Sequence, residues 1–258
     1  MLLAIDAGNT NIVFAVYDEL QKKYSWRCKT DSGKTADEYA AWLFQLFTKE
    51  NIEFSDIHGA TICSVVPDAN FHLMGLCNDV FKIEPFMVSY DTVKIKTALE
   101  NPNEIGSDRL VNTLAVIKEY ATPAIVIDFG TATTFDVIDA SGTYLGGVIA
   151  PGVNLSMEAL HMAAAKLPNI HVKKPEKVIG NNTVSAMQSG TFWGYASMVE
   201  GMVKRICSEI NARPYVLATG GLAPLFADTL EMIDHVDQDL TLRGLVQIYH
   251  DTHKQMAA

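Results

Sequence analysis

The sequence is poor in the features that are typical of secreted proteins, of proteins stabilised by a structural metal ion and of membrane-spanning proteins. It has 4 cysteines in 258 residues, and no two of them stand in a C-x-x-C spacing. Disulfide frameworks and zinc sites usually need closely spaced pairs, so neither is expected. No apolar run reaches the roughly 18 residues of a membrane-spanning helix. The apolar stretch after Met1 lacks basic residues and is interrupted by Asp6, unlike a secretion signal. We therefore expect a cytoplasmic protein with no membrane partner.

Positive charge is also scarce. Lys and Arg number 20 against 30 Asp and Glu, which gives a formal net charge of −10. Nucleic-acid surfaces gather positive charge on one face, so nucleic acid is not an expected partner. An acidic chain can still bind an anionic ligand through backbone N–H groups, a few placed cations and metal ions. The 48% of hydrophobic residues can fill the cores of one or two globular domains.

Two stretches of the chain share one pattern. LAIDAGNTNIVFAVYD begins at Leu3 and IVIDFGTATTFDVID begins at Ile125, so Asp6 and Asp128 lie 122 residues apart. Each stretch predicts a buried strand, a tight turn and an antiparallel second strand, because Gly and Asn accept the backbone angles of such turns. Unrelated hairpins are the alternative, but the matching register in two halves of about 120 residues indicates duplication.

The two acidic turns together predict a phosphate site. Each places an Asp at the end of a strand and follows it with Gly and with hydroxyl or amide residues. If the turns face each other across a cleft, backbone N–H groups can bind phosphates, and the carboxylates can bind the accompanying cations.

Other motifs follow each hairpin. They are NPNEIGSDR from Asn101, GGVIAPG from Gly146, KLP from Lys166, IGNNT from Ile179, ATGG from Ala218 and LTLRGL from Leu240. Apolar spacing predicts helices over residues 36–47, 110–120 and 183–210 and a buried strand over 59–66. Residues 169–182 are irregular and predict a surface loop over the site.

With these motifs the sequence resembles the acetate and sugar kinase, Hsp70 and actin superfamily, and within it the type III pantothenate kinases, over essentially its whole length. The resemblance implies an α/β protein with two duplicated ribonuclease H-like domains, residues 1–118 and 119–258, and a nucleotide cleft between them. It implies a homodimeric kinase that uses ATP to phosphorylate pantothenate to 4′-phosphopantothenate, the first step of coenzyme A biosynthesis.

The resemblance also implies roles for individual residues. Asp108 would be the catalytic base, and Arg109 would bind the carboxylate of pantothenate. Helix capping is the alternative role for Ser107, Asp108 and Thr183. The implied ATP site comprises Asp6, Ala7, Gly8, Asn9, Thr10, Asn11, Ile12, Val13, Thr131, Gly220 and Gly221, and the implied substrate site Gly106, Ser107, Asp108, Arg109 and Thr183. The implied cations are Mg²⁺ with ATP, held by Asp6 directly or through water, and K⁺ or ammonium at Asp128.

Three positions depart from the family pattern. Leu99 stands where the family usually has Tyr, Ser107 replaces the Ala of G-A-D-R, and Ala15 stands where the first motif often has Gly. None of these changes removes a proposed charged group. Two rival functions remain, namely a kinase for another small alcohol and a nucleotide-binding accessory or regulatory protein. A regulator would bind ATP without acceptor-dependent release of ADP.

Overall fold

The first repeated hairpin forms part of a five-stranded mixed sheet. Its strands β1 (Leu2–Ala7) and β2 (Asn11–Asp18) are antiparallel, as predicted. The sheet order is β3-β2-β1-β4-β5, with β3 (Gln21–Lys29), β4 (Gly59–Ser64) and β5 (Phe86–Met87). Because β4 and β5 run parallel to β1, the central strand β1 has an antiparallel neighbour on one side and a parallel one on the other.

The second hairpin builds a sheet of the same topology. Its strands are β6 (Ala124–Phe129), β7 (Ala132–Ile138), β8 (Tyr144–Pro151), β9 (Tyr215–Thr219) and β10 (His235–Val236), in the order β10-β9-β6-β7-β8. Asp6 pairs with Val13 across the first hairpin, and Asp128 pairs with Thr134 across the second. The predicted duplication is therefore confirmed, down to the position of the Asp within its strand.

The computed structural model describes residues 1–164 and 166–257, with the backbone alone for residues 255–257. It divides into two compact units that are not contiguous in sequence. The first comprises Met1–Ile95, Asn101–Ala115 and Leu240–Ala258, and the second Lys96–Glu100 and Val116–Asp239. These units differ from the expected division at residue 118 chiefly in the C-terminal helix, which joins the first unit. None of the helices in the described part is long and apolar enough to cross a membrane.

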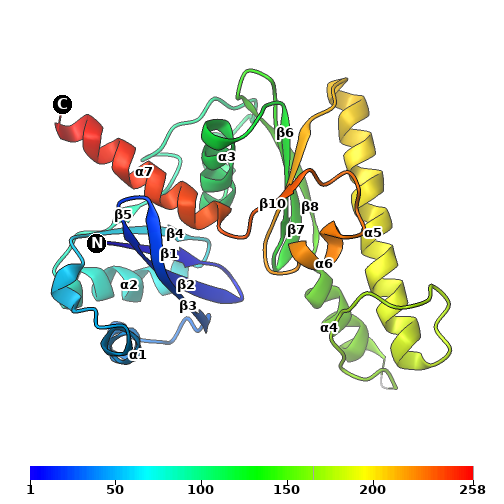
Figure 1. The fold of residues 1–258 in the computed structure, drawn as a ribbon, viewed down its shortest axis with the longest axis horizontal. Helices are drawn as coiled ribbons and strands as arrows, with labels where there is room; N and C mark the ends of the chain where they lie inside the picture. The colour runs from blue at the N-terminus through cyan, green and yellow to red at the C-terminus, as the bar shows by residue number, and fades with distance from the viewer. Residues whose placement is uncertain (165, 258) are drawn as a thin grey trace. The chain divides into compact units, whose positions relative to one another are not determined.

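Helices cover both faces of the first sheet (Figure 1). Helices α1 (Ala36–Lys49) and α2 (Pro67–Gly75), with the continuation η2 (Leu76–Phe81), pack on the face that carries Leu3, Ile5 and Phe14. Helix α1 begins where Thr35 and Glu38 form a reciprocal capping box. Helix α7 (Leu240–Ala257) covers the opposite face, where its Leu242 contacts the cluster of Leu2 and Ala4.

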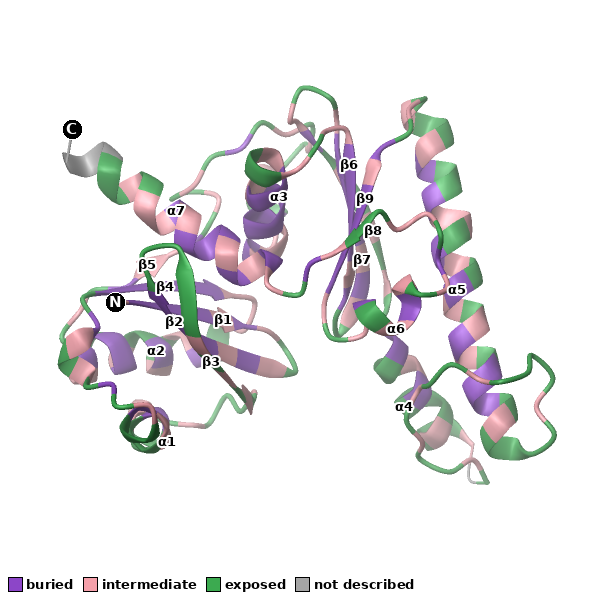
Figure 2. Cartoon of the chain, in the orientation of Figure 1, coloured by how far each residue is buried: buried purple, intermediate pink, exposed green. Residues whose placement is uncertain are grey.

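In the second unit, one face of the sheet is covered by the longest helix, α5 (Thr183–Ile210), and by α6 (Ala223–Ala227). Helix α5 has the predicted bounds, and buried residues recur along one side of it (Figure 2). The ring of Phe226 stacks on Phe129 and Phe192 with centroids 5.0 and 5.1 Å apart. Helix α4 (Val153–Ala163) follows β8 directly and packs beside α5.

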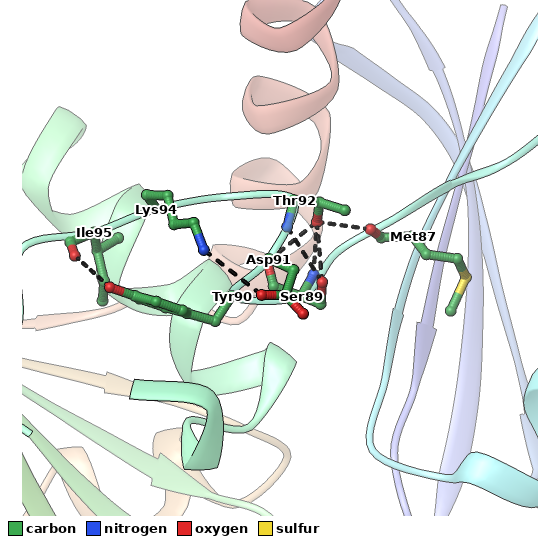
Figure 3. A network of polar contacts seen from close by, with 7 residues as sticks. All are labelled: Met87, Ser89, Tyr90, Asp91, Thr92, Lys94 and Ile95. Carbon is green, nitrogen blue, oxygen red and sulfur yellow. Dashed lines mark hydrogen bonds and ion pairs between the residues drawn. The ribbon is translucent and has the colours of Figure 1, made fainter. Parts of the chain in front are cut away.

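The segment between β5 and helix α3 (Ser107–Glu119) is irregular but internally bonded (Figure 3). The Thr92 hydroxyl lies 2.9 Å from the Met87 carbonyl and accepts the Ser89 N–H at 2.9 Å. Tyr90 donates to the Ile95 carbonyl at 3.4 Å, and Lys94 lies over its ring. The short turns η1 (Phe54–Asp56) and η3 (Pro102–Glu104) complete the first unit.

We expect Gly244→Ala to lower the thermal midpoint of unfolding. A Cβ atom at this position of α7 would lie 2.8 Å from the Val111 carbonyl oxygen of α3, so the two helices would have to separate. Overpacking of this kind costs about 1–3 kcal/mol. The matched control is Gly201→Ala in α5, where a Cβ would meet only the movable guanidinium of Arg205. The control should gain up to about 1 kcal/mol in helix propensity. Equal midpoints for the two variants would contradict the packing argument.

Candidate functional site

The first turn, residues 8–10, is held by the strand beside it. The N–H of Gly8 donates to the Asn11 carbonyl at 3.0 Å, which closes the turn. Thr30, just after β3, donates its hydroxyl to the Gly8 carbonyl at 2.6 Å and its N–H to the Thr10 carbonyl at 3.0 Å. Asn9 is exposed, as is Thr10, so both can reach a ligand. The turn is thus a fixed backbone with outward polar side chains, which suits phosphate.

The flanking residues of this turn differ in what they can offer a ligand. Ala7 and Ile12 are buried in the core, so only their backbone is available. Asn11 is half-buried at the start of β2. Val13 is half-buried beside Asp6 in the sheet.

A row of side chains crosses the sheet at Asp6. Asp6 pairs with Cys63 of β4 and Val13 of β2, and Val13 pairs with Arg27 of β3. Directly paired residues share one face of a sheet, and here it is the face opposite α1 and α2. Arg27 therefore lies on the face of Asp6 and is exposed there. Arg27 is not among the residues that the motifs predict, although strand alternation in residues 21–29 was the available signal.

Asp108 lies in the first turn of α3, and that turn is bonded to the end of β4. The buried Ser107 hydroxyl donates to the Ser64 carbonyl at 2.7 Å and accepts the Ser64 N–H at 3.1 Å. It also lies 3.3 Å from the Cys63 sulfur. Ser107 thus positions the helix, and its hydroxyl is engaged inside the protein. The residue that departs from the family pattern therefore supports the neighbouring carboxylate.

The Asp108 carboxylate is in close contact with the residues on either side of it in the chain. One carboxylate oxygen, Oδ1, accepts the N–H of the next residue, Arg109, at 2.8 Å. A Cβ atom at residue 106 would lie 2.7 Å from that same oxygen, which explains why Gly106 precedes it. Arg109 is half-buried in the same turn. The G-S-D-R motif therefore sets the direction of a carboxylate as well as starting a helix.

Asp6 and Asp108 are close enough for their charges to interact. Burial, and then the charge of Asp108, raise the pKa of Asp6 from 3.8 to about 7, while Arg27 lowers it. Burial also raises the pKa of Asp108, against the hydrogen bond from Arg109. Two carboxylates that repel one another in a partly dry site favour a bound proton or a bound cation.

We expect Asp6→Asn to raise the thermal midpoint of the metal-free protein, and more so at about pH 8 than at about pH 5. The pKa of Asp6 is higher in the fold than its ordinary 3.8, so the folded state binds the extra proton. Stability is therefore lost as the pH rises from about 4 to about 7. Asn carries no charge and avoids this loss. Each kcal/mol recovered moves the midpoint by about 2–4 °C in a chain of this size.

Scanning calorimetry at both pH values measures this effect. Addition of Mg²⁺ should shrink the difference between wild type and variant at the higher pH if the metal binds Asp6. An equal shift at both pH values would show that the variant acts on packing instead of charge.

The second turn in the second unit has its own supports. The Gly130 N–H donates to the Ala132 carbonyl at 3.0 Å, and both Gly130 and Thr131 are exposed. Behind the turn lies Gly152, where a Cβ atom would come within 2.7 Å of the Gly130 carbonyl oxygen. The turn therefore rests directly on the backbone that leads from β8 into α4.

Asp128 lies beside the T-G-G turn that follows β9. Asp128 pairs with Thr219 in the sheet, and Gly220 follows with a φ of +88°. A Cβ atom at residue 220 would collide with Asp128 Oδ1 and lie 2.7 Å from the Phe129 carbonyl oxygen. Gly220 is thus required by both its backbone angle and its surroundings, and Gly221 is exposed next to it. The structure brings Asp128 and Gly220 together in the second unit, with Thr131 in the turn that follows Asp128.

Thr183 belongs to a different feature, an apolar groove between α4 and α5. Asn182 caps α5, accepting the Ser185 N–H at 2.9 Å, and Thr183 is the exposed first residue of the helix. The groove is lined by Ser156, Leu160, Leu167, Thr183, Ala186, Met187, Gly190, Thr191, Gly194, Tyr195 and Met198. Capping of α5 thus falls to Asn182, which leaves Thr183 free for a ligand role.

The loop over residues 169–182 is irregular, as expected, but it is bonded to α5. Gln188 donates to the His171 carbonyl at 3.3 Å, and the Ser189 hydroxyl donates to the Val178 carbonyl. Three exposed lysines, Lys173, Lys174 and Lys177, lie in this loop beside the exposed Glu176, and the exposed Lys166 precedes it.

Solved structures share this architecture. A protein from Campylobacter jejuni described as a Baf family transcriptional activator superposes with a TM-score of 0.63 at 19% identity, over 98% of this chain and 99% of that one. The polyphosphate/ATP-glucomannokinase of Arthrobacter sp. strain KM superposes with a TM-score of 0.51 at 12% identity, over 98% of each chain. At these identities the likeness concerns the fold alone. The duplicated sheets define an α/β protein with two ribonuclease H-like domains, the fold class that the sequence predicted.

Sequence relatives then identify the family. The sequence model of type III pantothenate kinase matches residues 2–205. The type III pantothenate kinase of Paramagnetospirillum magneticum is 57% identical over 251 residues, covering 96% of each chain. That of Rhodospirillum rubrum is 53% identical over 251 residues, covering 96% of this chain and 98% of the relative. The chain belongs to the type III pantothenate kinase family, which confirms the resemblance stated above.

Proposed function

We propose that this chain transfers the γ-phosphoryl group of ATP to the primary hydroxyl of pantothenate, giving 4′-phosphopantothenate in the first step of coenzyme A biosynthesis. The single observation that carries the proposal is Asp108, a half-buried carboxylate with a raised pKa in the first turn of α3. It lies close enough to Asp6, at the end of the Gly-rich hairpin strand, for their charges to interact. We place the enzyme in the cytoplasm, where ATP is available.

Asp108 acts as the general base. As the pantothenate hydroxyl oxygen bonds to the γ-phosphorus, its proton passes to the Asp108 carboxylate, and the bond to the β-phosphate oxygen breaks to release ADP. A raised pKa makes Asp108 a stronger base than an ordinary aspartate. Arg109, on the same helical turn, binds the carboxylate of pantothenate, because a guanidinium matches that group in charge and shape.

Asp6 would hold Mg²⁺, directly or through water. The donor set fits, because two interacting carboxylates at Asp6 and Asp108 are relieved by a hard divalent cation. Among the described residues no group of three or more His, Cys, Asp or Glu side chains forms a complete metal cage, so phosphates and water would supply the remaining ligands. When bound, Mg²⁺ neutralises charge that develops on the phosphates.

Asp128 would hold a monovalent cation, K⁺ or ammonium. Asp128 Oδ1 and the Phe129 carbonyl oxygen both border the space that a Cβ at Gly220 would fill, and oxygen donors suit such ions.

Thr131 and the first turn, from Gly8 to Asn11, would bind the phosphates. Gly220 and Gly221 would let the backbone approach the adenosine. Thr183, in the α4–α5 groove, would contact pantothenate.

We expect Asp108→Asn to reduce kcat by about 10²–10⁴-fold, the usual contribution of a general base. The assay is release of ADP from MgATP with pantothenate, in K⁺ and again in Na⁺. Wild-type turnover should require pantothenate and should be faster in K⁺ than in Na⁺. ATP binding, measured by calorimetry, should persist in the variant because the turn residues are unchanged.

The same assay separates the rival functions. ADP released only with a different alcohol would make the chain a kinase of altered specificity, with Leu99 as the first position to examine. ATP binding without turnover on any alcohol would make it an accessory or regulatory protein. Full activity of Asp108→Asn would remove Asp108 from the mechanism.

We propose further that the enzyme is a homodimer formed through the second unit. Large apolar side chains are exposed on and around α4 and at the start of α5, including Leu155, Leu160, Met162 and Ile179. The last is 87% exposed, a costly arrangement for a side chain of this kind in water. A second copy packed against α4 and the start of α5 would cover them.

We expect Leu160→Asp to give a monomer in sedimentation velocity, because a charge in an apolar interface is desolvated without a partner. The matched control is Phe44→Asp on α1, which introduces the same charge at an exposed apolar position of the first unit. The control should sediment like the wild type. A dimeric Leu160→Asp, or a monomeric wild type, would contradict the proposed interface.

A further inference from the structure

Tyr195 joins the α4–α5 groove to the junction between β8 and α4. It lies on α5 and lines the groove together with Thr183. Its hydroxyl oxygen lies 2.9 Å from the Pro151 carbonyl oxygen, 3.1 Å from the Gly152 carbonyl oxygen and 2.5 Å from the Ser156 hydroxyl. A phenol donates one hydrogen and accepts others, so it can donate to one carbonyl while accepting from Ser156.

The junction that Tyr195 binds is the backbone behind the second turn. Pro151 pairs directly with Ala132, the residue after Thr131. Gly152 is so close to the carbonyls of Gly130 and Thr131 that a methyl group there would collide with both. The turn therefore has no room to move toward the junction, and its position depends on where the junction is held.

Helix α5 is a rigid support for this bond. Phe192, Ala196 and Val199, on either side of Tyr195, are buried in the core of the second unit. The junction is also bonded within its own helix, where Ser156 N–H donates to the Gly152 carbonyl at 2.9 Å. Tyr195 adds a bond from a different helix, which fixes the junction relative to the core.

We propose that Tyr195 is a positioning residue that holds the second phosphate turn in its binding geometry through Pro151 and Gly152. The proposal rests on the proposed function in one respect, the role of Thr131 in phosphate binding. Donors aimed at phosphate contribute most when they are fixed before the ligand arrives. Removal of the Tyr195 hydroxyl should therefore loosen the turn and weaken the use of ATP.

Tyr195→Phe tests this, because it removes one oxygen atom and keeps the ring. The matched control is Tyr90→Phe, which removes a hydroxyl bonded to the Ile95 carbonyl in the first unit (Figure 3). The first readout is amide hydrogen exchange of the peptide over residues 129–133 without substrates, in which the Gly130 N–H is bonded to Ala132. The second is kcat/KM for ATP.

Tyr195→Phe should speed exchange of residues 129–133 by about two- to tenfold, the effect of one neutral hydrogen bond. It should lower kcat/KM for ATP by a similar factor. Tyr90→Phe should change neither quantity. The exchange measurement needs no turnover, so it stands even if the wild type proves inactive on pantothenate.

Unchanged exchange at residues 129–133 in a folded Tyr195→Phe protein would overturn the proposal. So would an equal rise in exchange across the whole second unit, because that would show a general loss of stability. Ser156→Ala, which leaves the Tyr195 hydroxyl able to donate to a junction carbonyl, should have a smaller effect than Tyr195→Phe. A larger effect would place the support in Ser156 instead.

Discussion

The pairing of β1 with its two neighbours is the constraint on which the first half of the site depends. Residues of β1 alternate between the core that faces α1 and α2 and the opposite face, which carries Asp6. A shift of one residue would turn Asp6 into the apolar core and Ile5 out of it, so burial of Leu3 and Ile5 fixes the register. Beyond Asp6 the Val65 N–H still donates to the Ala7 carbonyl at 3.0 Å. The end of β4 therefore reaches both the phosphate turn and, through Ser64, the helix of Asp108.

This arrangement places negative charge where the site is partly dry. Without a cation, Asp6 and Asp108 repel one another, and the fold raises the pKa of both carboxyl groups. Such repulsion disfavours the empty site and favours a cation between carboxylates and phosphates. The repulsion lowers the free energy of unfolding of the free protein, and a bound cation removes that loss. Such a loss of stability is common where side chains are arranged for binding.

The second unit reaches the same geometry by other means. Asp128 has the same place in its strand as Asp6, but it pairs with Thr134, six residues on, whereas Asp6 pairs with Val13, seven residues on. Close backbone approaches at Gly152 and Gly220 take the place of the bonds that Thr30 and Ser107 make in the first unit. Glycine at these two positions removes the side chain that would separate a turn from its support. Duplication thus preserved the position of the Asp, while the supports around each turn diverged.

The sequence by itself determined the two hairpins, the bounds of α5, and the family through motifs such as G-S-D-R. These features are local, since strand alternation, helical spacing and turn residues act over a few positions. Tertiary structure decided what lies beside the motifs. Ser107 bonds to Ser64 across 43 residues, Tyr195 bonds to Pro151 across 44, and α7 returns to the first unit. No local pattern encodes such contacts, because they depend on which faces meet once the sheets have formed and the apolar surfaces are buried.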